Sequence, residues 1–259
     1  MNLIIGLLIV FIVYKLYLRR YEFFNQNKPY FMTKEETIEF FKSDRDNYIK
    51  DMTDLDMKAL KSSSKVDYLN KSISDAESFT NEEKRILIRA CGEADDFFRK
   101  FNKIPNINFK KIADIKWVLS KTKGKWYEGS FPHTRLNMIF ITPDVINHYE
   151  VTRILVHEKM HVFERLFPDE MRVWIEAEGY KPYKKFSDYP MRRSNPDLDG
   201  MVYLDKNGNE TIVQFTTMNP TSIDDKVTYP GNKDWKVEHP NETLAYRVDY
   251  YYSGEPIDF

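Results

Sequence analysis

The chain has 259 residues, of which 42% are hydrophobic and 31% are charged, and this composition indicates a globular protein rather than a disordered one. The formal net charge is −1, with 39 Lys or Arg side chains against 40 Asp or Glu, so no basic field predicts nucleic acid as a partner. The single cysteine, Cys91, excludes an intrachain disulfide and a zinc site built from cysteines.

The N-terminus begins with an unbroken apolar run over residues 3–14, which continues past Lys15 to the pair Arg19 and Arg20. A membrane-spanning helix needs about 20 residues, and a lysine can extend its ammonium group to the interface. No cationic segment precedes the run, which disfavours a cleaved signal peptide. We therefore expect a transmembrane anchor over residues 1–20. The positive-inside rule predicts a single-pass membrane protein with the N-terminus outside and the globular domain on the cytosolic side.

The next part of the chain, residues 21–106, is expected to be a helical region. Thr33 and Thr80 each stand three residues before a glutamate, the capping-box pattern that marks the start of a helix. The second of these helices has an apolar stripe that includes Cys91. We interpret this thiol as a small core residue rather than a nucleophile.

From residue 107 onward the pattern changes. Residues 112–120 and 135–142 are rich in β-branched and apolar side chains, so both segments are predicted to be strands. A helix is then expected from about residue 149 to residue 167, because Pro168 cannot continue it.

This helix contains His157-Glu158-Lys159-Met160-His161, an HExxH motif. Residues four apart lie one turn apart on the same helix face, so both imidazoles can reach one metal ion. Glu158 points beside such an ion, where it can take a proton from an activated water. Zinc fits, because it accepts two histidines and a carboxylate and keeps one position open. The alternative interpretation is an amphipathic surface helix whose histidines bind nothing.

The strand and the motif helix, residues 135–167, resemble the zincin superfamily of metallopeptidases. The resemblance implies an α+β fold over residues 107–259: a small mixed sheet with an edge strand, an HExxH active-site helix and a C-terminal glutamate helix. In such enzymes an extended substrate adds to the edge strand. The helical region and the transmembrane helix would precede this domain. Lys159 departs from the family pattern, which is mostly uncharged here, and it fits if it faces solvent.

The third zinc ligand is expected to be a carboxylate, because Phe167 stands where a third histidine of the HExxHxxGxxH pattern would be. Asn241-Glu242-x-x-Ala245 resembles the glutamate helix of the gluzincins, and this resemblance implies that Glu242 is the ligand. Family members often place an aspartate four residues later, where this chain has Tyr246. Another group, Asp249 or a backbone carbonyl, is then expected to orient a ligand histidine.

Glu178 is the rival third ligand, since it lies 17 residues after His161, and Glu176 is a weaker candidate on the same stretch. With Glu242 as the ligand, the long insertion between the two metal-binding helices is predicted to contain a hairpin within residues 201–215.

These patterns predict a membrane-anchored zinc metallopeptidase, a hydrolase that acts on a peptide or protein substrate. Zn²⁺ would be held by His157, His161 and Glu242, and a zinc-activated water would attack the peptide carbonyl with Glu158 as general base. The alternative is a catalytically inactive zincin-fold protein with a structural or interaction role at a membrane. The sequence gives no indication of an oligomeric state.

Overall fold

The computed structural model describes Lys15 and residues 28–228 and 238–255. A five-stranded mixed sheet forms its centre, with the strand order β1-β3-β5-β4 and with β2 beside β3. β1 and β5 run parallel to β3, whereas β2 pairs with β3 and β4 pairs with β5 in antiparallel register. The strands are β1 (Tyr30–Phe31), β2 (Ala76–Glu77), β3 (Val118–Thr122), β4 (His133–Arg135) and β5 (Met138–Ile141).

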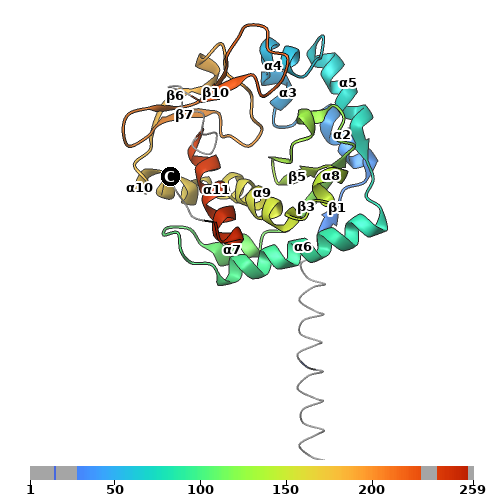
Figure 1. Cartoon of the computed structure of the whole chain (residues 1–259), viewed down its shortest axis with the longest axis vertical. Helices are drawn as coiled ribbons and strands as arrows, with labels where there is room; N and C mark the ends of the chain where they lie inside the picture. Colours follow the sequence, from blue (N-terminus) through green and yellow to red (C-terminus); the bar gives the residue numbers. More distant parts are fainter. Residues whose placement is uncertain (1–14, 16–27, 229–237, 256–259) are drawn as a thin grey trace, which may run out of the picture.

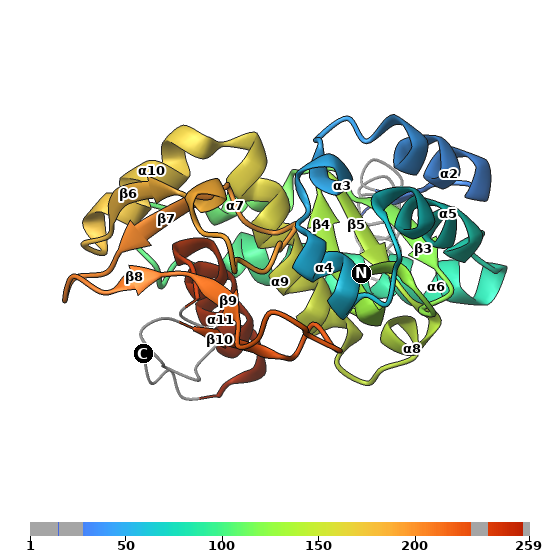
Figure 2. The ribbon, with the colours of Figure 1, turned by 90° about the horizontal axis from the view of Figure 1, so that it is seen from above.

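Helices cover both faces of this sheet (Figures 1 and 2). The helices before β3 are α2 (Lys34–Ser43), α3 (Tyr48–Asp51), α4 (Asp54–Ala59), α5 (Lys65–Asp75), α6 (Asn81–Lys100) and α7 (Phe109–Ala113). A 3-10 turn, η1 (Tyr127–Ser130), precedes β4. The helices after β5 are α8 (Pro143–Ile146), α9 (Val151–Leu166), α10 (Pro168–Ala177) and α11 (Pro240–Ser253).

Residues of β5 alternate between two hydrophobic cores, as the side chains of a strand must. Ile139 and Ile141 pack into the core formed with α6, α9 and α11, whereas Met138 and Phe140 pack into the core formed with α2 to α5. β1 and β2 come from the expected helical region, so that region contributes strands to the same sheet as the motif helix.

Local signals at the helix starts are confirmed. Thr33 and Thr80 cap α2 and α6 with complete capping boxes. Cys91 is buried in α6, as expected of a core residue. α6 crosses below α9 and α11 in Figure 1 and packs against α9, so it supports the helix that carries the motif.

The two strand predictions need correction. Residues 112–120 contain the end of α7 and then the start of β3. Residues 135–142 are not one strand, because a tight turn at Leu136 and Asn137 divides them between β4 and β5. Leu136 adopts a left-handed conformation with φ 52°, which a bulky residue rarely takes, and hence no turn signal marks this hairpin.

The insertion between α10 and α11 forms small antiparallel sheets. β6 (Lys181–Lys185), β7 (Met201–Leu204) and β8 (Glu210–Thr211) make a three-stranded sheet, and β9 (Val213–Phe215) pairs with β10 (Lys226–Thr228). A second 3-10 turn, η2 (Phe186–Asp188), follows β6. The predicted hairpin is confirmed between β7 and β8, with Gly208 at φ 83° in its turn, whereas the last part of its predicted second strand, residues 213–215, forms β9 and pairs with β10.

The expected transmembrane helix is corrected. The segment predicted for it, residues 1–20, lies outside the described residues apart from Lys15. Among the helices that the structure does describe, none is both long enough and apolar enough to cross a membrane. Even the 20-residue α6 is amphipathic, with charged side chains such as Glu82 and Arg85 on its exposed face. The described residues therefore do not bear out the membrane-spanning helix of the expected fold class or the single-pass membrane location.

Candidate metal centre

Two helices bring three possible ligand atoms together. α9 presents His157 and His161 on one face, and α11 packs along α9 and presents Glu242 from its first turn. Nε2 of His157 lies 3.1 Å from Nε2 of His161. Oε2 of Glu242 lies 3.5 Å from Nε2 of His157 and 3.7 Å from Nε2 of His161. These three side chains could hold a metal ion, because their ligand atoms all lie within 4.8 Å of one another.

Each histidine has a carboxylate at its other ring nitrogen. Nδ1 of His157 lies 3.1 Å from Oδ2 of Asp249, and Nδ1 of His161 lies 2.9 Å from Oε2 of Glu164. Each Nδ1–H can therefore donate to a carboxylate, which leaves the lone pair on Nε2, the form that a metal ligand needs. Asp249 thus occupies the orienting role that the sequence suggested for it.

The charges at the centre favour a bound cation. Burial lowers the pKa of His157, but its contacts with Asp249 and Glu242 outweigh this and raise that pKa well above its ordinary value. Burial raises the pKa of Glu242, yet the charges of His161 and His157 and the hydrogen bond from His157 lower it to about 2. An ionised carboxylate thus faces two imidazole nitrogens, and a divalent ion could take the place of the proton on His157.

Glu158 lies beside the three possible ligands and not among them. Oγ1 of Thr134, in β4, lies 3.0 Å from Oε2 of Glu158 and donates a hydrogen bond to it. Burial raises the pKa of Glu158 to about 7, although the charge of His157 and the Thr134 hydrogen bond lower it. A carboxyl group with such a pKa can both accept and return a proton near neutral pH.

Residues 194–197 of the insertion cross the site between β4 and α11. Nδ2 of Asn195 donates to Oε1 of Glu242 at 3.1 Å and to Oε1 of Glu238 at 2.8 Å. This bond holds one oxygen of Glu242 and leaves the other facing the histidines. The backbone N–H of Thr134 donates to Oδ1 of Asp197 at 2.7 Å. Asp197 therefore already accepts the hydrogen bond that Thr134, in the edge strand β4, would otherwise donate to an added substrate strand.

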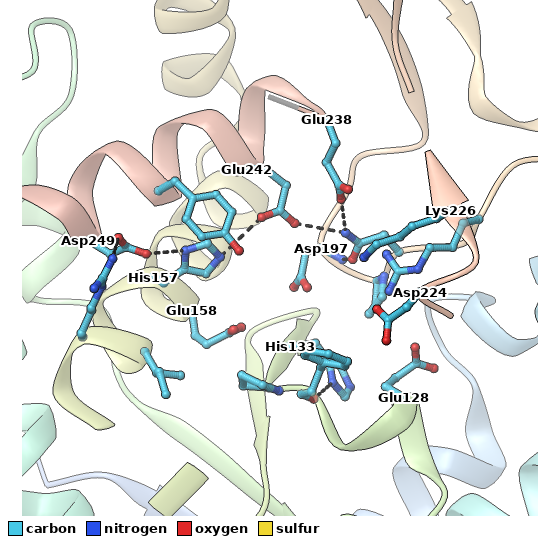
Figure 3. A pocket seen from close by; sticks show the side chains of 18 of the residues that line it. Glu128, His133, His157, Glu158, Asp197, Asp224, Lys226, Glu238, Glu242 and Asp249 are labelled. Carbon is cyan, nitrogen blue, oxygen red and sulfur yellow. Dashed lines mark hydrogen bonds and ion pairs between the residues drawn. The ribbon is translucent and has the colours of Figure 1, made fainter. Parts of the chain in front are cut away.

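A cavity of about 610 Å³ opens beside these side chains (Figure 3). His157, Glu158 and Glu242 all line it, together with residues of η1, β4, residues 193–197 and β10. The group that could bind a metal and the group that could transfer a proton therefore face the same space, which is large enough for a small ligand or part of a peptide.

The rival third ligands lie elsewhere. Glu178 ends α10, and its Oε2 accepts a hydrogen bond from Arg247 at 2.7 Å. Glu176 lies on the exposed side of α10. The structure brings neither of them to the histidines.

Lys159 does not face solvent, which corrects the expectation for this position. Its side chain is 1% exposed, and Nζ lies 2.5 Å from Oδ1 of Asp95 and 4.1 Å from the ring centre of Trp117. Asp95 belongs to α6, so the unexpected positive charge of Lys159 is balanced by a carboxylate from a neighbouring helix. Sequence spacing gave no signal for this pair, because its members are 64 residues apart.

Several residues at the site carried no recognisable signal in the sequence. Three of them make contacts between segments that are distant in the chain, namely Thr134, Asn195 and Asp197. The fourth, Glu164, contacts His161 within α9. Comparison of the chain with protein-family models, with curated proteins and with solved structures finds no match. The geometry of the centre is thus the main evidence for what it does.

Proposed function

We propose that this chain is a zinc-dependent metallopeptidase of the gluzincin type, in which His157, His161 and Glu242 hold Zn²⁺ and Glu158 is the general base. The convergence of two Nε2 atoms and a carboxylate oxygen supports this proposal above all other observations. Two histidines and one carboxylate are a ligand set typical of catalytic zinc.

A zinc ion held there would activate a water molecule and polarise the carbonyl of the substrate. Glu158 would accept the proton of the attacking water and then deliver it to the leaving amine. Thr134 positions Glu158 for both transfers, because its hydroxyl holds one carboxylate oxygen at 3.0 Å. Asp249 and Asn195 hold His157 and Glu242 in the orientation that the metal needs.

The first test measures zinc per chain by elemental analysis for the full-length protein and for Glu242→Gln and Glu178→Gln. We expect about one zinc per chain in the wild type and in Glu178→Gln. We expect much less zinc per chain in Glu242→Gln, because the loss of a ligand should lower the zinc affinity at least tenfold. Glu178→Gln is a matched control, because it makes the same chemical change outside the centre. A folded wild-type chain that binds no zinc would refute the proposal.

The second test measures peptide hydrolysis across a library of mixed peptides. Glu158→Gln should keep its zinc and lose activity by about 10²- to 10⁴-fold, because the general base is removed while the ligands remain. Zinc-loaded wild-type protein that cleaves no peptide would instead favour the catalytically inactive alternative.

A further inference from the structure

The cavity beside the candidate metal centre is lined by more acidic than basic side chains. Eight carboxylates line it, against three Lys or Arg side chains, so a bound divalent ion would still leave carboxylates in excess. Some of these carboxylates are already engaged: Glu242 faces the histidines, while Glu150 and Asp249 contact Arg153. Glu128 and Asp224 lie on the other side of the cavity, where Arg193 and Lys226 also line it.

That side has a wall that we call the acidic wall, formed by Glu128, His133 and Asp224. Figure 3 shows these three side chains gathered on the side of the cavity away from Asp249. Glu128 is buried in η1 and accepts a hydrogen bond from the hydroxyl of Tyr68. Asp224 is exposed at the rim, just before β10. The three residues come from separate segments, so the fold and not a local charge run creates the wall.

His133 gives an independent sign of a missing ligand. Its side chain lines the cavity and is 3% exposed, and its Nε2 is buried without a hydrogen-bond partner among the described residues. Nδ1 lies 3.0 Å from the carbonyl oxygen of Phe131 and must donate to it. Nε2 of the neutral ring is therefore an acceptor, and a buried acceptor without a donor is costly.

The wall thus offers only acceptors: two carboxylates and one imidazole nitrogen. Two cations, Arg193 and Lys226, line the same cavity. The charge of Arg193 acts on Glu128 and that of Asp224 acts on Lys226, but none of these four side chains satisfies the hydrogen-bonding need of His133. A metal ion is a poor match for the wall, because the described side chains that could hold one are His157, His161 and Glu242. A ligand with several N–H donors and a positive charge matches the wall better.

We propose that the acidic wall of Glu128, His133 and Asp224 binds an organic cation of the substrate, either the side chain of an arginine or lysine or a free amino terminus. The identification of that substrate as a peptide rests on the proposed function. The binding surface itself contains no metal ligand, so it should bind cations whether or not zinc is present.

The test measures binding to the full-length chain by calorimetry, once with zinc and once with a chelator. The probes are N-acetylarginine amide, its uncharged analogue N-acetylcitrulline amide, N-acetylglutamate amide, and alanine amide for the amino terminus. We expect N-acetylarginine amide or alanine amide to bind about tenfold or more tightly than N-acetylcitrulline amide, with or without zinc. Which of the two cations binds distinguishes side-chain recognition from recognition of the amino terminus.

The variants Glu128→Gln and Asp224→Asn should each weaken binding of the preferred cation by about tenfold, and Glu176→Gln should leave it unchanged. Asp224 is exposed, so its variant tests the wall even if Glu128→Gln fails to fold. Equal binding of N-acetylarginine, N-acetylcitrulline and alanine amides would overturn the inference, as would tighter binding of N-acetylglutamate amide through Arg193 and Lys226. Cation binding in a chain that holds no zinc would refute the metallopeptidase and leave the wall intact.

Discussion

At the level of single residues, the two oxygens of Glu242 have different partners. Oε1 accepts a hydrogen bond from Asn195, whereas Oε2 faces the Nε2 atoms of His157 and His161. Because one oxygen is already held, the other is directed toward the position where a metal would bind. The sequence indicates Glu242 as a ligand by its place near a helix start, but Asn195 lies 47 residues away and only the fold joins the two.

His133 should make the stability of the protein sensitive to acid. Burial and the charges of Arg135 and Arg165 lower its pKa to about 3, although the bond to Phe131 and the charge of Asp46 raise it. The unfolded chain protonates a histidine near pH 6.5. The folded state therefore has its full stability above about pH 6.5 and loses about 1.4 kcal/mol per pH unit as the pH falls below it.

The variant His133→Asn removes this titration and keeps a donor for the carbonyl of Phe131. Urea unfolding in the presence of a chelator should show the stability advantage of wild type over the variant shrinking by about 1.4 kcal/mol per unit between pH 6 and pH 4. The exposed His148 provides the control, and His148→Asn should follow wild type at every pH. Parallel curves for wild type and His133→Asn would show that His133 does not titrate as described.

At the level of elements, the contact between α6 and α9 contains the buried pair of Asp95 and Lys159. Burial raises the pKa of Asp95 and lowers that of Lys159, which shows that each charge is costly to bury. Removing one partner should therefore be far more harmful than replacing both.

Asp95→Asn should lower the free energy of unfolding by about 3 to 5 kcal/mol, because it leaves the ammonium group of Lys159 buried without a counter-charge. Asp95→Leu combined with Lys159→Met should recover most of this loss. Asp96→Asn is the matched control, since Asp96 is the next residue of α6 and its side chain is 58% exposed. Urea unfolding measures all of them, and a wild-type midpoint for Asp95→Asn would contradict the role of the pair.

At the level of the whole molecule, the candidate metal centre joins parts that are distant in the chain. The 80 residues between His161 and Glu242 include α10 and the insertion that follows it. Zinc that binds only the folded arrangement should stabilise the whole chain, by about 4 kcal/mol at a concentration of 1,000 times its Kd.

In thermal unfolding, zinc should raise the Tm of wild type by roughly 10 °C relative to chelator-treated protein. Glu158→Gln should show the same shift, because Glu158 is not a ligand in the proposed centre. Glu242→Gln should lose most of it. A shift of equal size in wild type and Glu242→Gln would mean that zinc binds somewhere else.

Interactions within a few residues could be predicted from the sequence alone. The capping boxes at Thr33 and Thr80 and the spacing of His157 and His161 depend only on helix geometry, and the structure shows both. The start of α11 next to Glu242 was predictable for the same reason.

The tertiary structure alone decided which distant groups meet. The burial of Lys159 against Asp95, the bond from Asn195 to Glu242 and the cavity with its acidic wall each join segments far apart in the chain. The hairpin at Leu136 likewise depends on pairing between β4 and β5 and not on a turn residue. Local propensity reflects neighbours along the chain, whereas burial and charge pairing depend on packing between elements, and a single sequence does not show that packing.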